Sequence, residues 1–325
     1  MDLETVDCPI CRRDGTRPFL TARDINVFVP GEFELVRCAI CGIVYVNPRP
    51  TAASIGEYYP SRYWAPPPPE GAKPYLDTGM RRVLALLTRR YPSGRVLDVG
   101  CGVGKMPAVM GELGLEAVGL EPYEHACKLA RERYGLEVIC ATLQEADLPN
   151  SSFDAVTLFD VLEHVHDPVG DLRRAFELLK PGGSVFVKVP NLAALQARIF
   201  GRWWYCLDTP RHLFHFSPAS LRRTLEAAGF RDIDCRALPD WQGAMVFETS
   251  VVYWLRGRLL DRRGISVAPL GEQTVGEALE GKVYPGVPSA GKRVFRWFVR
   301  NVAYLPLAIE NVIGRSVTLL AAGRR

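Results

Sequence analysis

The chain has 325 residues, of which 48% are hydrophobic and 23% charged, a composition that excludes a disordered protein and supports a large core. The formal net charge of +4 is unevenly placed, because residues 240–325 carry 12 basic and 7 acidic side chains while the remainder is close to neutral. This excess suits a phosphate-bearing substrate or an anionic membrane surface, but it is too weak to demand nucleic acid.

The acidic N-terminus lacks the basic-then-apolar pattern of a secretory signal, and no apolar run approaches the roughly 20 residues that span a bilayer. We therefore expect a cytoplasmic protein, with association at the inner membrane surface as an alternative. Nine cysteines are present, four of them in two Cys-x-x-Cys pairs. Metal ligation by these four, with reduced thiols elsewhere, is a more economical interpretation than a disulfide framework.

The two cysteine pairs lie in residues 1–50, at Cys8 and Cys11 and at Cys38 and Cys41. Each pair can present two thiolates to one tetrahedral ion, and four thiolates make a closed, structural zinc site. The alternative is two unrelated buried pairs. We predict a zinc-ribbon-like module over 1–50, followed by a Tyr- and Pro-rich linker over 51–73.

Short β-branched runs alternate with amphipathic segments from residue 74 onward, which predicts a parallel sheet covered by helices on both faces. We expect a core domain at 74–238, an insertion at 239–313 and a last core strand within 314–325. The expected strands are 95–99, 116–120, 136–141, 153–159, 184–189, 231–237 and 316–322. The expected helices include 76–91, 124–134, 171–179 and one that begins after Ser217. The fold class is therefore α/β, with a Rossmann-like, mostly parallel seven-stranded sheet.

The first predicted core strand carries Asp98 and runs into a loop with glycines at Gly100, Gly102 and Gly104. Such a loop lets the backbone approach a nucleotide closely. The spacing differs from the dinucleotide fingerprint and from the P-loop, where Met106 stands in place of the magnesium-binding hydroxyl. Glu121 ends the second strand, where an acid can hold ribose hydroxyls. The alternative is a simple tight turn with an acidic helix start.

Residues 90–240 resemble the class I methyltransferases that use S-adenosylmethionine, through this loop and through the segments 150–156, 160–165 and 178–183. The resemblance implies that Asp98, the glycines and Cys101 flank the amino-acid part of the cofactor. It implies further that Glu121 and Pro122 lie at the ribose, Thr142 and Leu143 at the adenine, and Asp160 at the sulfonium centre. Many members have an aspartate where Thr142 stands, so the adenine contact departs from their pattern.

Three histidines are candidate bases, because an imidazole with a pKa near 6.5 can accept a proton from a hydroxyl or carbon during methyl transfer. His212 is the first choice and His215 the second, both in the segment 208–216 that follows the fifth strand. The alternative for both is capping of the helix after Ser217. His164, after the fourth strand, is the third candidate, with a structural hydrogen bond as its alternative role.

Residues 38–50, the tyrosine-rich stretch 58–64 and the segment Pro-Arg-His-Leu-Phe-His-Phe-Ser at 210–217 resemble a bacterial methyltransferase subgroup with an N-terminal zinc module. That subgroup includes sugar C-methyltransferases. The resemblance implies transfer to a hydroxyl or carbon of a sugar or related small molecule, nucleotide- or lipid-linked, with 58–64 as a wall of the acceptor site or as ordinary interdomain packing.

Two other functions remain open at this point. One is an RNA methyltransferase that uses the zinc module for binding, although the six arginines of residues 1–50 are offset by acidic residues in the same stretch. The other is a non-catalytic adaptor with a methyltransferase fold, against which the complete glycine loop and Glu121 argue. The insertion at 239–313 suits a lid, a dimer surface or a membrane-surface element.

Overall fold

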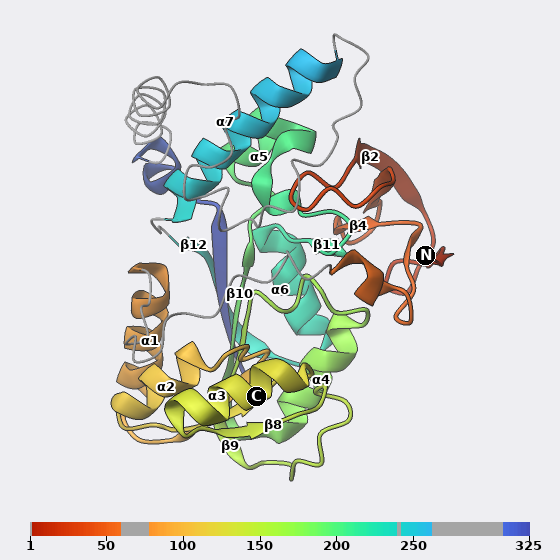
Figure 1. Cartoon of the computed structure of the whole chain (residues 1–325). Helices are drawn as coiled ribbons and strands as arrows, with labels where there is room; N and C mark the ends of the chain where they lie inside the picture. Colours follow the sequence, from red (N-terminus) through yellow and green to blue (C-terminus); the bar gives the residue numbers. More distant parts are fainter. Residues whose placement is uncertain (1, 60–77, 239–241, 262–307) are drawn as a thin grey trace, which may run out of the picture.

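The computed structural model describes residues 2–59, 78–238, 242–261 and 308–325 (Figure 1). The strands are β1 (Leu3–Glu4), β2 (Thr16–Ala22), β3 (Phe33–Cys38), β4 (Val44–Val46), β5 (Arg49–Pro50), β6 (Arg95–Val99), β7 (Glu116–Leu120), β8 (Glu137–Ile139), β9 (Phe153–Phe159), β10 (Leu179–Pro190), β11 (Phe214–His215), β12 (Arg231–Leu238) and β13 (Thr318–Arg324). The α-helices are α1 (Thr78–Arg90), α2 (Lys105–Glu112), α3 (Glu124–Tyr134), α4 (Pro168–Leu178), α5 (Leu195–Phe200), α6 (Pro218–Ala227) and α7 (Gln242–Asp261). Short 3-10 turns are η1 (Ile55–Tyr58), η3 (Gly201–Trp203) and η4 (Tyr205–Leu207).

The core is a seven-stranded sheet in the order β12-β13-β10-β9-β6-β7-β8. The pairs from β10 through β8 are parallel, and β13 runs antiparallel to both of its neighbours. The predicted α/β fold with a mostly parallel seven-stranded sheet is therefore confirmed. β10 begins at Leu179, directly after α4 ends at Leu178, and its pairing with β9 shifts register between Leu179 and Ser184.

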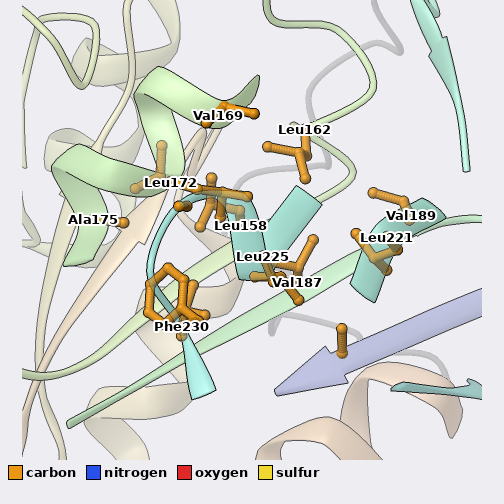
Figure 2. Close-up of a cluster of buried hydrophobic side chains, with 14 of the residues drawn as sticks. Leu158, Leu162, Val169, Leu172, Ala175, Val187, Val189, Leu221, Leu225 and Phe230 are labelled. Carbon is orange, nitrogen blue, oxygen red and sulfur yellow. The ribbon is translucent and has the colours of Figure 1, made fainter. Parts of the chain in front are cut away.

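Alternate residues of the central strands face the two helical layers. On β9, Ala155 and Phe159 lie in one apolar cluster with side chains of α1 and α2, while Val156 and Leu158 lie in another with α4 and α6. Figure 2 shows this second cluster, in which Leu172 lies near Leu158 and Leu225. This period of two follows from the pleat of the strands and places apolar residues against both layers.

The N-terminal segment is joined to the core through a shared sheet. The strand order of this sheet is β11-β4-β3-β2. The strand β11 belongs to the core segment that follows β10, and it pairs Phe214 with Tyr45 and His215 with Val44. In Figure 1 the N-terminal sheet lies to the right of the core sheet, and α5 and α7 lie above the upper end of the core sheet. The segment 208–216, predicted to carry the base, is therefore held by the N-terminal residues as well as by the core.

Part of the predicted insertion forms α7, which packs on α5 through an edge contact between Phe200 and Phe247, with ring centroids 5.3 Å apart. Buried Gln196 of α5 donates to the Gly243 carbonyl and to Glu310. Residues 262–307 of that insertion, and residues 60–64 of the tyrosine-rich stretch, lie outside the described part of the chain. None of the helices within the described ranges has the length and apolar character needed to cross a bilayer.

The prediction of reduced thiols outside the two pairs is wrong for Cys127 and Cys140, which form a disulfide. Cys127 lies on α3 and Cys140 directly follows β8, and the return of the chain from α3 into β8 brings their Cα atoms to 6.1 Å. That separation lies within the range that a disulfide spans. Sequence spacing alone does not reveal such a neighbour.

Replacing Leu172 by alanine tests the packing between α4 and the sheet. The Leu172 side chain is fully buried, so Leu172→Ala should lower the free energy of unfolding by about 2–5 kcal/mol in denaturant titration. Leu113→Ala is the matched control, because Leu113 is 48% exposed, and should change stability by no more than about 0.5 kcal/mol. Equal effects of the two substitutions would contradict this packing.

Candidate active site

The glycine loop between β6 and α2 leaves one open position. All three glycines have positive φ, at +67° for Gly100, +53° for Gly102 and +84° for Gly104. A Cβ atom at Gly100 would lie 2.5 Å from Val161, and one at Gly104 would lie 2.5 Å from Leu136, whereas one at Gly102 would meet nothing within 4 Å. The outer two glycines therefore permit packing within the chain, and the backbone at Gly102 is accessible to a ligand.

Two buried acids lie beside this loop. Thr157 Oγ1 donates to Asp98 Oδ1 at 2.5 Å, and Glu121 accepts from the backbone N–H groups of Gly102 and Tyr123 at 2.9 and 3.1 Å. Burial raises the pKa of Asp98 to about 7 and also raises the pKa of Glu121. Neither acid forms an ion pair within the described residues. A ligand with an ammonium group and ribose hydroxyls fits both carboxylates, because it supplies the positive charge that they lack and further hydrogen-bond donors.

The predicted adenine contacts follow β8. Thr142 donates its N–H and its hydroxyl to Glu145 Oε2 at 3.2 and 2.7 Å, and Leu143 is buried. Cys101 packs in an apolar cluster with Cys127 of the disulfide, and Pro122 is exposed at the start of the turn into α3. The disulfide therefore packs next to Cys101, and Cys140 precedes Thr142 by two residues.

Asp160 directly follows β9 and has a left-handed φ of +57°, next to a buried lysine. Lys188 of β10 is 1% exposed, and its Nζ donates to Asp160 Oδ2 at 2.6 Å. The Asp160 side chain is about half exposed, whereas Lys188 is buried. The carboxylate is therefore accessible at the carboxyl ends of the parallel strands while it remains paired with the lysine. Sequence reasoning did not identify Lys188, although a lone lysine within the apolar run Val185–Val189 is a signal for it.

The segment 208–216 is organised around a fully buried Arg211. Its guanidinium binds Asp24 through both terminal nitrogens, at 2.9 and 2.7 Å, and binds Asp208 Oδ1 through Nη2 and Nε, at 2.6 and 3.1 Å. Asn26 also donates to Asp208 Oδ1, at 2.6 Å. Although burial opposes ionisation of Asp208, Arg211 holds the pKa of that carboxyl well below its ordinary value. Asp24 and Asn26 were not predicted as site residues.

His212 lies beside this ion network. Its Nδ1 is 3.0 Å from the Cys206 carbonyl, which can only accept, so Nδ1 carries the proton and Nε2 carries the lone pair. Nε2 lies 3.8 Å from Asp208 Oδ2. Burial, followed by the neighbouring His164, lowers the pKa of His212 to about 3. The side chain is therefore neutral at physiological pH and its Nε2 can accept a proton.

The other two candidate histidines differ in their surroundings. The His164 ring meets the His212 ring edge-on with centroids 4.6 Å apart, and its Nδ1 lies 2.9 Å from the Tyr59 hydroxyl and 3.1 Å from the Arg211 carbonyl. His215 lies in β11, and its Nε2 is 2.9 Å from the Leu207 carbonyl. Neither His212 nor His215 caps α6. The cap is Ser217, in a reciprocal capping box with Ser220.

Glu163 completes the histidine cluster. It is buried, its Oε2 has no hydrogen-bond partner within the described residues, and burial together with the charge of Asp160 raises its pKa well above the ordinary value. One ligand atom from each of Glu163, His164 and His212 lies within 4.8 Å of the others. Two histidines and a carboxylate are also a donor set for a divalent cation, so this cluster can hold either a proton or a metal ion.

The four paired cysteines converge in the N-terminal segment. The Cys8 and Cys41 sulfurs are 3.4 Å apart, those of Cys11 and Cys38 are 3.6 Å apart, and all four lie within 4.8 Å of one another. The edge of a tetrahedron of four sulfurs around zinc is about 3.8 Å. The backbone N–H groups of Ile40 and Cys41 point at the Cys38 sulfur, an arrangement that stabilises a thiolate. The sequence-predicted quartet is thus a cluster of the size of a metal site.

Comparison with known proteins relates the core to methyltransferases. A family model described as a methyltransferase domain matches residues 74–234. A ubiquinone biosynthesis O-methyltransferase from Xanthomonas axonopodis pv. citri is 33% identical over 184 residues, which cover 53% of this chain and 76% of that enzyme. One of the same description from Idiomarina loihiensis is 32% identical over 156 residues, which cover 44% of this chain and 64% of the relative, less than two thirds of its length.

A solved structure of a SAM-dependent methyltransferase from Thermotoga maritima has a TM-score of 0.46 and 18% identity, and covers 76% of this chain and 87% of its own. The cysteine quartet lies outside the residues that the family model matches, whereas Asp98, Glu121, Asp160 and all three candidate histidines lie within them.

The buried acids predict a pH-dependent affinity for S-adenosylmethionine. The positive charge of the ligand favours the ionised form of Asp98, whose pKa is about 7 in the free protein, so binding should release a proton. Affinity should rise about tenfold between pH 6 and pH 8, with Glu121 contributing in the same direction. Calorimetry in buffers of different ionisation enthalpy measures both quantities.

Asp98→Asn is the control for this measurement, because the ionisation of the ligand itself is the same for both proteins. The variant should bind more weakly and lose most of the pH dependence. A wild-type affinity that is constant between pH 6 and pH 8 would contradict the assignment of Asp98 to the cofactor site.

Proposed function

The chain belongs to the class I S-adenosylmethionine-dependent methyltransferases, and on that premise we propose that it methylates a hydroxyl or carbon of a small molecule, with His212 as the general base. One observation carries the choice of base. His212 is a neutral imidazole whose Nδ1–H is fixed by the Cys206 carbonyl, which leaves Nε2 as the nitrogen that can take a proton. The three-residue step from Asp160 to Glu163 puts this cluster next to the predicted sulfonium position.

Bound S-adenosylmethionine would supply a methyl group on a positively charged sulfur. The backbone at Gly102 would contact it, Glu121 would accept from its ribose hydroxyls, and Asp98 would balance its positive charge. Asp160, held by Lys188, would face the reacting end. Because the acceptor attacks an already activated methyl group, alignment of the two reactants supplies much of the rate acceleration.

The acceptor must lose a proton when a hydroxyl or a carbon is methylated. As the new bond to the methyl group forms, the proton on the acceptor would pass to His212 Nε2. His164 lies next to the proposed base, since its ring edge meets the His212 ring and its Nδ1 contacts the Tyr59 hydroxyl. His215, with Nε2 at the Leu207 carbonyl within β11, suits a structural role better than a catalytic one.

The proposed acceptor is a sugar or a related metabolite, nucleotide- or lipid-linked. Two observations support a small molecule that loses a proton: the relatives whose names describe O-methylation, and the histidine cluster beside the cofactor edge. The alternative, RNA, finds little support, because N-terminal arginines pair with acids, as in Arg12 with Asp167, Arg23 with Glu32 and Arg49 with Glu4. We further propose a cytoplasmic location, with the inner membrane surface as the alternative for a lipid-linked acceptor.

His212→Ala tests the general base. Turnover should fall by about 10²–10⁴-fold while affinity for S-adenosylmethionine is retained, because the cofactor site is formed by other residues. His125→Ala is the matched control, since His125 is exposed on α3 and should leave turnover unchanged. Isotope-labelled methyl transfer and calorimetry give the two readouts.

Two results would overturn the assignment. Full turnover by His212→Ala, or a large loss on His215→Gln in its place, would move the base to another residue. A chelator could also abolish turnover, and an added divalent cation could restore it, while the cysteine quartet keeps its metal. That result would assign the cluster of Glu163, His164 and His212 to a metal ion instead of a proton.

We also propose that the cysteine quartet holds structural zinc. Four sulfurs at nearly tetrahedral spacing fill every position of the ion and leave none for a substrate. Burial of the quartet against Tyr45 and Ile43, within the same apolar cluster as the core, supports a role in holding the N-terminal sheet together.

Metal analysis of protein purified under reducing conditions tests this proposal. About one zinc ion per chain is expected, and Cys38→Ser should lose it together with thermal stability. Cys235→Ser, at a free cysteine outside the quartet, is the control and should keep the metal. Wild-type protein with almost no zinc would show that the quartet is not a zinc site.

A further inference from the structure

We propose that Asp208 is a positioning residue for the methyl transfer, whose negative charge stabilises His212 when it is protonated, and that Asp24 of the N-terminal segment holds it in place through Arg211. The proposal rests on the proposed function, in which His212 is the base. It assigns the N-terminal segment an electrostatic part in the reaction in addition to its metal cluster.

The donors of Arg211 are all used in this arrangement. Nη1 donates to Asp24 Oδ2 and to the Tyr58 carbonyl, Nη2 donates to Asp24 Oδ1 and Asp208 Oδ1, and Nε donates to Asp208 Oδ1. A guanidinium carries five N–H groups, so every one has an acceptor. The side chain therefore has a single orientation, and it fixes Asp208 relative to Asp24.

Asp24 is itself fixed by backbone donors. Its Oδ1 accepts from the N–H groups of Asn26 and Val27, and its Oδ2 accepts from the N–H group of Val29. These residues form the turn between β2 and β3, and Asn26 also donates to Asp208. This turn therefore donates hydrogen bonds to both Asp24 and Asp208. A loop of the N-terminal segment thus fixes the position of Asp208, the side chain next to His212.

The charges of this network favour a proton on His212. Asp24, Asp208 and Arg211 carry one net negative charge in a buried region, where charges act more strongly on one another than in water. Asp208 Oδ1 is engaged by Arg211 and Asn26, and Oδ2 is the oxygen nearest His212 Nε2, at 3.8 Å. When His212 accepts the acceptor's proton, its positive charge balances the network and Oδ2 lies next to the new N–H group.

His212 is nevertheless neutral before the reaction, because burial, followed by the neighbouring His164, lowers its pKa, while Asp208 acts in the opposite direction. The other groups around the ring are His164, His215 and Glu163. Burial lowers the pKa of each histidine and raises that of Glu163, which favours the uncharged form of all three side chains. Asp208 is therefore the anion that stabilises the protonated state and the transition state that leads to it.

Asp208→Asn tests the proposal, since the amide keeps the shape of the side chain and removes its charge. We expect kcat to fall at least tenfold, with the affinity for S-adenosylmethionine and the KM of the acceptor changing less than twofold. Asp208→Glu, which retains the charge, should recover a substantial part of the lost kcat. Asp24→Asn should lower kcat in the same direction by a smaller factor, because it acts only through Arg211.

The control is Asp234→Asn, at an exposed aspartate on β12 that pairs with Arg236, which should leave kcat unchanged. If Asp208→Asn does not fold, Asn26→Ala carries the test, because it removes one donor to the same carboxylate and should also lower kcat with unchanged cofactor affinity.

Unchanged kcat in Asp208→Asn, or equal kcat in Asp208→Asn and Asp208→Glu, would overturn the proposal for Asp208. In that case a large loss of turnover in His212→Ala would still support His212 as the base. Full turnover by His212→Ala would instead overturn the proposed base.

Discussion

A buried arginine between two aspartates is the interaction on which this site depends. Arg211 is inaccessible to solvent, and it joins Asp24, in the turn between β2 and β3, to Asp208, beyond the fifth parallel strand. Removing one partner of a buried ion pair leaves an uncompensated charge and typically costs about 3–5 kcal/mol. The four-stranded sheet adds a second link, since β11 pairs with β4. The N-terminal segment and the catalytic core therefore form one structure around His212.

The rest of the site follows from the carboxyl edge of the parallel sheet. β6 delivers Asp98 and the glycine loop, β7 delivers Glu121, and β9 delivers Asp160, so that three acids converge where a parallel sheet binds its ligand. Asp98 and Glu121 have no ionic partner among the described residues, whereas Asp160 forms an ion pair with Lys188. In the proposed function, Asp98 and Glu121 lie at the cofactor, whereas the ion network of Asp24, Arg211 and Asp208 lies beside the proposed base.

Local patterns in the sequence sufficed for the sheet, for the convergence of the four paired cysteines and for the start of a helix after Ser217, because each rests on neighbouring residues or on a short repeat. The residues that sequence reasoning missed depend on contacts across the chain. Asp24 meets Arg211 across 187 positions, and Lys188 meets Asp160 only when β10 pairs with β9. The Cys127–Cys140 disulfide needed the turn from α3 into β8, and β11 is too short to be recognised without its partner β4.

The most direct test of the account is the fate of an isotope-labelled methyl group from S-adenosylmethionine, followed in the full-length protein with a panel of nucleotide sugars, lipid-linked sugars, simple hydroxylated metabolites and RNA. The account predicts label on an oxygen or carbon of one small-molecule class, with none in RNA. Label in RNA, or no transfer to any member of the panel by protein that binds S-adenosylmethionine, would contradict it.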